Sequence, residues 1–345
     1  LIGAAGGALF NYFELPLAWM IGAMTFTTFT SLSGIPLRSS NRLRTVVIPV
    51  LGVMLGSAFK PDTLDKVNLW IPSLSIMVLY VIFISATVGF FFYKFVKVDL
   101  VTAFFSATPG GLATMVILGS DHGGNEKIIA LTHSIRILLT VLIIPFWFQF
   151  FEGYQIGGQQ VTIHLSELYM SDTLILLLSG LIGFYGGKII KLPSYQLLGP
   201  MLLSAMVHLL GLTTASLPTI IINIAQIIIG SGIGSRFSGV SIKQVSRTLI
   251  SAIISTIYIL SLAALASSIL TVSTGIPFKT LLLSFAPGGL AEMTLISFSM
   301  GIDPAFVSTH HLLRVSIMVI MAPIIFNFLK KNLSFYTKTK GPNIN

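Results

Sequence analysis

Apolar residues fill long runs of this chain, and short polar stretches separate the runs. Most runs are about 17 to 25 residues long, which suits helices that cross about 30 Å of hydrocarbon. The pattern predicts twelve apolar segments, at residues 1–14, 16–34, 44–60, 69–93, 99–122, 126–151, 172–190, 194–212, 218–236, 246–272, 278–300 and 304–329. No stretch is typical of a separate soluble domain, so the pattern indicates an all-α polytopic membrane protein.

The apolar pattern occurs twice along the chain. The sequence PGGLA at 109–113 recurs at 287–291, an offset of 178 residues (287 minus 109). The same offset relates His133 to His311, Arg136 to Arg314, Pro145 to Pro323, Gly52 to Gly230 and Gly56 to Gly234. Such self-similarity indicates an internal duplication. We therefore expect a first membrane repeat at 1–151, an external connector at 152–171, a second membrane repeat at 172–329 and a cytoplasmic basic tail at 330–345.

Charge supports a membrane protein and sets its orientation. Charged residues are only 9% of the 345 residues and hydrophobic residues 54%, against about 25% charged in a typical soluble domain. The net charge is +9, but the basic residues lie between apolar runs, which is typical of membrane loops and not of nucleic-acid binding. The connector has no Lys or Arg and is expected outside, whereas the tail, with Lys330, Lys331, Lys338 and Lys340, is expected in the cytoplasm.

Two halves that end on opposite sides each need an odd number of crossings, although each half has six apolar segments. One segment per half must then enter and leave by the same face, and the fifth, which Pro-Gly-Gly interrupts, is the natural candidate. We therefore predict two inverted repeats, each with five transmembrane helices and one re-entrant Pro-Gly-Gly hairpin. The alternative is that the broken segment crosses, which gives twelve spans.

The two hairpin tips are expected to meet near the bilayer midplane. Each arm has roughly ten residues and is therefore about 15 Å long. The tips would consist of Pro109, Gly110 and Gly111 and of Pro287, Gly288 and Gly289. Unpaired backbone at this depth is tolerated only where protein buries it or where it lines a wet cavity. Inverted repeats with broken helices are typical of secondary transporters, whose binding site lies at the repeat interface.

The sixth segment of each half carries a histidine and an arginine three residues apart, His133 with Arg136 and His311 with Arg314. Residues at this spacing share a helix face. We expect the helices to begin after Asn125 and Asp303, which places both arginines about 15 Å deep. An arginine near the midplane costs at least about 2.5 kcal/mol unless it has partners. The functional hypothesis is that both pairs bind an anionic substrate; the structural alternative is that each arginine bonds the freed backbone carbonyls of its hairpin.

Glu292 follows the second Pro-Gly-Gly-Leu-Ala, where Thr114 stands in the first half. A carboxyl near a buried tip can take up a proton or bind Na⁺ and so couple transport to an ion gradient; alternatively, it neutralises Arg314. Substrate binding is thus assigned to the six tip residues, the two His–Arg pairs, Thr114 and Glu292. Solvation or capping is expected nearer the segment ends, at Asp121, Asp303 and His310.

Other motifs call for less specific chemistry. The chain has no cysteine, which excludes disulfides and cysteine-based metal sites, and its six histidines are scattered, so no metal or cofactor is predicted. The pairs Gly52 with Gly56 and Gly230 with Gly234 indicate close helix packing. Asn223 and Gln226, beside the second glycine pair, are candidates to line a polar path.

Two copies of P-G-G-L-A, each followed some twenty residues later by H-x-x-R, and an L-P near the start of each half resemble the AbrB family of bacterial membrane proteins. The resemblance covers essentially the whole chain. It implies an internally duplicated membrane protein. Members are often labelled ammonia monooxygenases or linked to gene regulation, and others are treated as transport proteins; an unrelated small DNA-binding regulator shares the name. Copper or iron oxidation needs clustered histidines, and here only His133 and His311 are repeat-related.

These patterns together predict a secondary transporter in the bacterial cytoplasmic (inner) membrane and not an enzyme. Its expected substrate is a small organic anion of carboxylate type, carried by alternating access between the two tips, with H⁺ or Na⁺ as the coupling ion. The expected partners are that substrate, the lipid bilayer and, by analogy with other transporters, a second copy of the chain. The alternatives are a passive channel for a small neutral solute such as ammonia, and a non-transporting membrane regulatory protein.

Overall fold

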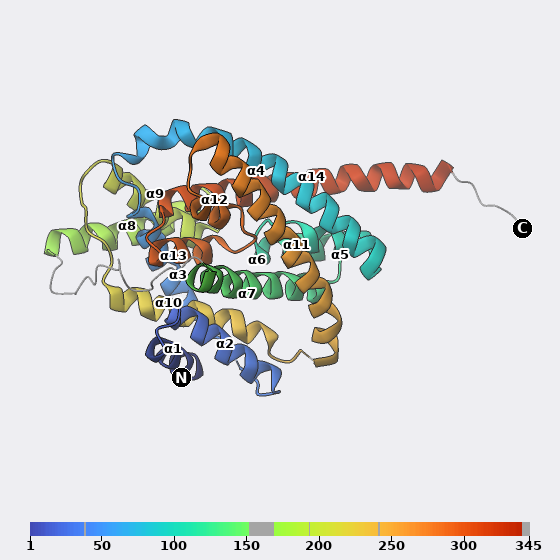
Figure 1. Ribbon diagram of the computed structural model, residues 1–345, viewed down its shortest axis with the longest axis horizontal. Helices are drawn as coiled ribbons and strands as arrows, with labels where there is room; N and C mark the ends of the chain where they lie inside the picture. The colour runs from blue at the N-terminus through green and yellow to red at the C-terminus, as the bar shows by residue number, and fades with distance from the viewer. Residues whose placement is uncertain (38, 152–168, 193, 241, 340–345) are drawn as a thin grey trace, which may run out of the picture.

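Every regular element in the described part of the chain is a helix (Figure 1). The computed structural model describes residues 1–345 except 38, 152–168, 193, 241 and 340–345, and it does not describe the side chains of 242–245, 247 and 329–339. The expected connector falls almost entirely outside the described residues. The helices are α1 (Ile2–Tyr12), α2 (Ala18–Leu32), α3 (Asn41–Gly56), α4 (Thr63–Phe91), η1 (Phe92–Val96), α5 (Leu100–Ala107), α6 (Leu112–Asp121), α7 (Glu126–Phe151), α8 (Met170–Ile189), α9 (Tyr195–Leu209), α10 (Thr219–Gly234), η3 (Ser235–Phe237), α11 (Ile242–Thr274), α12 (Phe278–Phe285), α13 (Leu290–Ser299) and α14 (Pro304–Thr339).

The helix bounds repeat with the offset of the sequence motifs. Moving α3, α5 and α6 by 178 residues reproduces the bounds of α10, α12 and α13, and moving α2 by 177 residues reproduces those of α9. The breaks at 108–111 and 286–289 fall at the two Pro-Gly-Gly motifs, because Pro lacks the amide hydrogen that would continue the helix. The duplication therefore includes whole helices as well as the short sequence motifs.

Helices α1, α2, α3, α8, α9 and α10 form one group, which we call the glycine-packed bundle. Within it α2 packs on α1 and on α10, while α9 packs on α8 and on α3. The third helix of each half thus packs on the second helix of the other half. This exchange interlocks the two repeats.

Glycines make the exchanged contacts possible. A methyl group at Gly52 would lie 2.5 Å from the carbonyl oxygen of Leu197, and one at Gly56 would lie 2.5 Å from that of Met201. The repeat equivalents Gly230 and Gly234 face α2 in the same way. The prediction of close packing at both glycine pairs is confirmed, because backbone meets backbone there with no room for a side chain.

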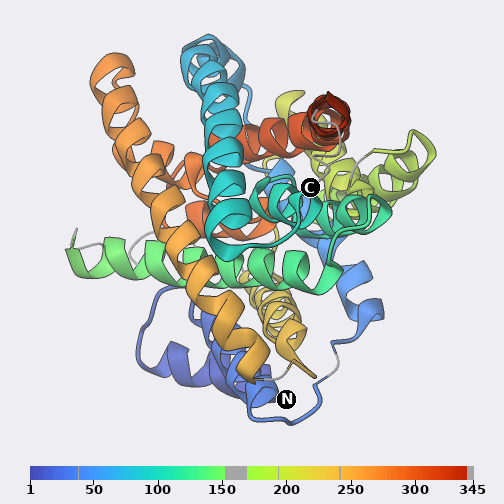
Figure 2. The ribbon, with the colours of Figure 1, turned by 90° about the vertical axis from the view of Figure 1, so that its right-hand side faces the viewer.

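The other helices, α4 to α7 and α11 to α14, form the broken-helix bundle. Its members pack in chain order, α4 on α5, α6 on α7, α11 on α12 and α13 on α14, and the long α4 and α11 lie on one side of this bundle (Figure 2). The two arms of the first broken segment fold back on each other. The amide of Asn125, after α6, donates to Thr102 Oγ1 in the first turn of α5 at 2.7 Å.

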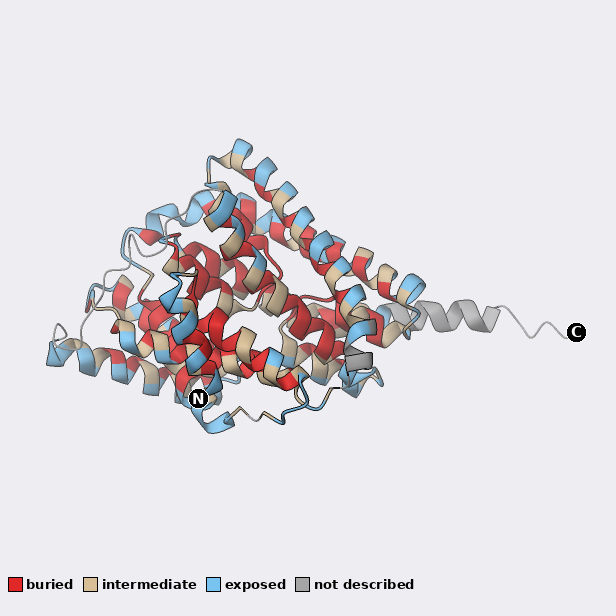
Figure 3. Cartoon of the chain, turned by 60° about the horizontal axis from the view of Figure 1, so that its bottom comes forward, coloured by how far each residue is buried: buried red, intermediate tan, exposed pale blue. Residues whose placement is uncertain are grey.

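In the part of the chain that the structure describes, six helices are long and apolar enough to cross a membrane, namely Thr63–Val96, Glu126–Phe151, Met170–Ile189, Thr219–Phe237, Thr248–Thr274 and Pro304–Phe328. The protein is thus an all-helical membrane protein. Buried residues gather in its centre and exposed residues lie on the outer helices (Figure 3). Many of the exposed residues are large and apolar, as lipid requires. On α8, for example, Leu174, Leu177 and Leu181 are about half exposed. The ten crossings and the two re-entrant hairpins stay predictions.

The expected helix starts are confirmed. Asn125 Oδ1 accepts from the amide of Ile128, and Asp303 Oδ1 accepts from the amides of Ala305 and Phe306, so both side chains cap a helix. The last helix, however, does not end at 329. Helix α14 continues to Thr339, which places ten residues of the expected tail, 330–339, in the same helix.

Candidate functional site

The first His–Arg pair joins α7 to the end of α5. His133 Nε2 donates to the carbonyl oxygen of Phe105 at 2.9 Å. Arg136 Nη1 donates to the carbonyl oxygens of Ser106 and Ala107 at 3.4 and 3.3 Å, and its Nη2 donates to His133 Nδ1 at 2.6 Å. These carbonyls lack helical partners because α5 stops at the break. The pair therefore satisfies the backbone that the Pro-Gly-Gly motif leaves open.

The second pair makes a related set of bonds. His311 Nε2 donates to the carbonyl oxygen of Leu283 at 2.8 Å, in the position equivalent to the bond of His133. Arg314 Nη1 donates to Ala286 O at 2.6 Å and its Nη2 to Gly288 O at 2.5 Å. Both acceptors belong to the second break, 286–289, and Gly288 to its tip, so this arginine reaches further along the break than its counterpart. The His311 Nδ1 atom is buried and has no hydrogen-bond partner.

Both arginines are buried without a counter-ion. Their side chains are 4% and 3% exposed for Arg136 and Arg314, and no carboxylate of a described residue forms an ion pair with either. The Nε atom of each guanidinium is also buried without a partner. The bonds to carbonyls are those that the structural alternative predicted. They leave two positive charges uncompensated in the centre of the protein.

The first tip lies against the second half of the chain. A methyl group at Gly110 would lie 2.9 Å from the Met318 side chain, and one at Gly111 would lie 3.9 Å from that of Val315, the residue after Arg314. In the second half, α13 packs on α7. Each broken segment therefore contacts the arginine-bearing helix of the other repeat, and Pro109, Gly110, Pro287 and Gly288 are buried there.

Glu292 lies in the first turn of α13, where its carboxylate folds back over Gly289. The alternative that it pairs with Arg314 is not seen in the structure. Arg236 in η3 lies within electrostatic range of both Glu292 and Arg44. The repeat equivalents of Glu292, Arg236 and Arg44 are Thr114, Ala58 and Ile222. The sequence motifs did not single out these two arginines, and their missing counterparts in the other repeat were the signal that could have done so.

His310 differs from its expectation. It was expected to be solvated or to cap a helix, but it is fully buried. Its Nε2 lies 2.8 Å from Ser73 Oγ, its Nδ1 lies 2.9 Å from Phe306 O, and its ring stacks on that of Phe306. The expectation was wrong because tertiary partners from α4, which sequence position does not reveal, satisfy the ring. Among the described residues, no three of the types His, Cys, Asp and Glu come close enough to hold a metal ion.

A polar cavity of about 350 Å³ lies between the two bundles. The glycine-packed bundle contributes the end of α3, the stretch before α10 and one face of α10, including Asn223 and Gln226. The broken-helix bundle contributes Leu295 and Phe298 of α13 and the residues that start α14. The expectation that Asn223 and Gln226 line a polar path agrees with this position. None of the twelve predicted binding residues lines the cavity, although Glu292 is only three residues from Leu295.

The sequence profile of the family described as "Transition state regulatory protein AbrB" matches residues 19–330. The chain belongs to the AbrB family. Similar proteins include "Uncharacterized protein YhjN" of Bacillus subtilis (strain 168), 27% identical over 95% of this chain and 91% of that protein. They also include "Putative regulator AbrB" of Escherichia coli (strain K12), 24% identical over 92% of this chain and 91% of that protein. The AbrB profile spans both broken segments and both His–Arg pairs, so the resemblance noted in the motifs is confirmed.

Proposed function

We propose that this AbrB-family membrane protein is a secondary transporter of a small organic anion, such as a carboxylate. The observation that carries the proposal is the pair of buried guanidinium groups, Arg136 and Arg314, with no carboxylate beside them. Uncompensated buried charge is unfavourable, and an anion of matching geometry relieves it. A neutral solute gains nothing from these charges.

The substrate would bind between the two tips as an alternative acceptor for the guanidinium groups. Arg314 donates to two carbonyls of the second break, one of them that of Gly288 in the tip, so an anion that takes their place also releases the tip. Binding and tip movement then become one event, which alternating access requires. Glu292, in the first turn after the second tip, is the candidate group for H⁺ or Na⁺ coupling.

The paths of α3 and α10 support inverted repeats. The cavity brings together the α3–α4, α9–α10 and α13–α14 connections at one face. The α2–α3 connection meets the residues after η3 at the other face, where the Leu37 amide donates to Ser238 Oγ at 3.0 Å. Equivalent helices α3 and α10 thus run in opposite directions between these faces. In our proposal the first face is external and the second is cytoplasmic, which agrees with the basic residues Arg42 and Arg44 near the second.

A thermal-shift screen of the purified full chain tests the substrate class. Small carboxylates, sulfonates, phosphate and ammonium would be added with and without Na⁺ and at two pH values. A ligand at 100 times its Kd stabilises by about 2.7 kcal/mol, so a specific anion raises the melting temperature by a few degrees. The matched variant is Arg314→Gln, which keeps hydrogen-bond donors but removes the charge.

The expected result is a shift with one class of anion that Arg314→Gln abolishes while the variant still melts cooperatively. An unchanged shift in the variant would leave the arginine a structural role only. A shift with ammonium alone would favour the passive channel. No shift with any of these compounds would favour the non-transporting regulatory protein, the role that the name of the Escherichia coli relative suggests.

A further inference from the structure

The polar cavity between the bundles is built from one face of α10. Ile222, Asn223 and Gln226 lie within one helical turn of each other and point to the same side. Opposite them, α13 presents Leu295 and Phe298. The cavity volume, about 350 Å³, falls within the range of small-molecule sites. The space therefore suits a small solute and lies where the two bundles would separate.

Two amide side chains in the cavity have no partner. Gln226 is only 5% exposed, yet neither it nor Asn223 makes a hydrogen bond to a described residue. Neither amide is among the side-chain groups that are sealed from solvent without a partner, so both open to the cavity, where water or a solute can bond them. The first-half equivalents are Thr45 and Ile48. The amide pair is a property of this face and not of the duplicated plan.

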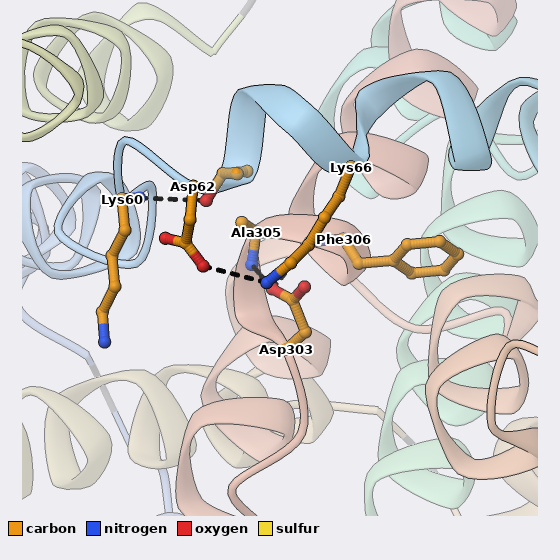
Figure 4. A network of polar contacts seen from close by, with 7 residues as sticks. Lys60, Asp62, Lys66, Asp303, Ala305 and Phe306 are labelled. Carbon is orange, nitrogen blue, oxygen red and sulfur yellow. Dashed lines mark hydrogen bonds and ion pairs between the residues drawn. The ribbon is translucent and has the colours of Figure 1, made fainter.

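The charged residues at the cavity mouth differ in whether their side chains already have a partner. Asp303 is an acidic lining residue, but its carboxylate caps α14 and has the Lys66 ammonium beside it, which also donates to Asp62 at 2.9 Å (Figure 4). Lys60 lines the cavity as well and forms no ion pair with a described residue (Figure 4). Of the two charged residues that line the cavity, Lys60 and Asp303, only Lys60 has a side chain without a hydrogen bond or ion pair to a described residue, and its ammonium lies within electrostatic range of Asp62. An ammonium beside two amides can receive an anion.

The cavity lies on the helix that follows the second tip. Glu292 is one turn below Leu295 on the same face of α13, which is about 5 Å along the helix. At the far end of the interface, the positions equivalent to Ala58 and Ile222 of the cavity are Arg236 and Arg44. The small and apolar positions that leave the cavity open are thus replaced there by two long cationic side chains, of which Arg236 is within electrostatic range of Glu292.

We propose that this cavity is the external entry chamber for small carboxylate anions, in which the amides of Gln226 and Asn223 and the ammonium of Lys60 receive the solute before it reaches the tip. The inference rests on the proposed transport function for the identity of the solute. It assigns a binding role to three residues outside the His–Arg pairs. It also implies that the structure is open on the Lys60 side and closed on the Arg236 side.

The chain has no cysteine, so single cysteines report on this chamber directly. Gln226→Cys and Asn223→Cys would be treated with an anionic and a cationic methanethiosulfonate reagent, each rate being normalised to that of 2-mercaptoethanol. The matched control is Ala225→Cys, which is next in sequence, 1% exposed and outside the cavity. We expect the cavity thiols to react at least about tenfold faster than the control, because buried thiols are inert. We also expect the anionic reagent to be preferred several-fold, and Lys60→Gln to remove that preference.

Slow labelling of both cavity cysteines would mean that a solute does not reach them, and it would overturn the proposal of an entry chamber. Fast labelling without a preference for the anionic reagent would overturn the substrate class assigned to it. Protein in detergent is labelled whatever its orientation, so labelling in detergent but not from outside intact cells would contradict only the external position. Arg314→Gln should leave these rates unchanged, which separates failure of this inference from failure of the anion site at the tips.

Discussion

The two His–Arg pairs are equivalent in sequence but differ in their bonds. His133 and His311 make the same bond to the helix before the break. Arg136 then turns to its own histidine and to the last residues of α5, whereas Arg314 leaves its histidine free and holds the tip. The backbone differs accordingly, because Gly111 has a φ of 89° and its equivalent Gly289 has a φ of −77°.

The difference shows that one sequence pattern supports two bonding states. The vacant Nδ1 of His311 is the atom that Arg314 would bond if the second half adopted the state of the first. In the proposed transporter with inverted repeats, an exchange of states between the halves would change access from one face to the other. The duplicated residues would then provide the two alternatives, and the unduplicated ones, such as Glu292 and Arg236, would provide the bias between them.

The largest effects should come where the halves are alike. Gly52→Ala and Gly230→Ala each place a methyl group against a backbone carbonyl of the partner helix, which cannot move aside alone. We expect both variants to lose monodisperse folded protein to the same extent, measured by fluorescence-detected size exclusion. Gly186→Ala, also in a helix but facing open space, is the control and should be neutral or slightly stabilising. A large inequality between the two glycines would break the symmetry inferred for this bundle.

A smaller and unequal effect is expected at the arginines. Lysine keeps the charge but cannot bridge two carbonyls. Arg314→Lys should therefore lose more stability than Arg136→Lys, because the bonds of Arg314 to the tip are short and those of Arg136 to the backbone are 3.3 to 3.4 Å. The expected loss is about 1 to 3 kcal/mol for each carbonyl left without a donor. The measurement is the melting temperature of each variant, which shows which of the two loses more stability. Equal losses would mean that the two bonding states do not differ in energy.

We expect the charge of Glu292 to have only a weak effect on the equilibrium between the two bonding states. Removing its charge in Glu292→Gln weakens its attraction to Arg236 and should make the face near Arg44 easier to open. The readout is labelling of Ser39→Cys, a position that lies with Arg44 beside Gly232. We expect a rate increase of a few-fold, since screened charges contribute little more. Thr114→Val, the change at the equivalent position, should leave the rate as it was, and an equal increase there would remove the special role of Glu292.

The smallest effect is expected at the exposed ion pair outside the comparison. Lys66 donates to Asp62 and holds the pKa of that carboxyl below its usual value. A lowered pKa stabilises the folded state above the ordinary carboxyl pKa, and this contribution disappears as the pH falls through the lowered value. Because both side chains are more than half exposed, Lys66→Gln should change the melting temperature at neutral pH by less than about 1 °C. A larger change would indicate that this cluster also holds α4 to the start of α14.

Sequence reasoning found what the duplication repeats and missed what tertiary packing decides. The offset between two Pro-Gly-Gly motifs was enough to place both breaks, the helix starts at Asn125 and Asp303 and the acceptors near each arginine. It did not predict which helix each glycine pair meets, because α3 and α9 are far apart along the chain and local pattern carries no pairing. The burial of His310 was missed for the same reason, since Ser73 comes from another helix. The sequence also could not predict that Arg136 and Arg314 bond different acceptors, because equivalent sequences predict equivalent geometry.

The exchange of α3 and α10 between the halves has a consequence for how the protein is made. The glycine face of α3 stays uncovered until α9 is synthesised, about 140 residues after Gly56. At the usual rate of synthesis this interval is roughly ten seconds or more. During this interval the first half is in the membrane, and the backbone at the glycine face of α3 is exposed because α9, the helix that covers it, has not yet been synthesised. The two halves, made as separate polypeptides, should therefore persist only when both are produced in the same cell at the same time.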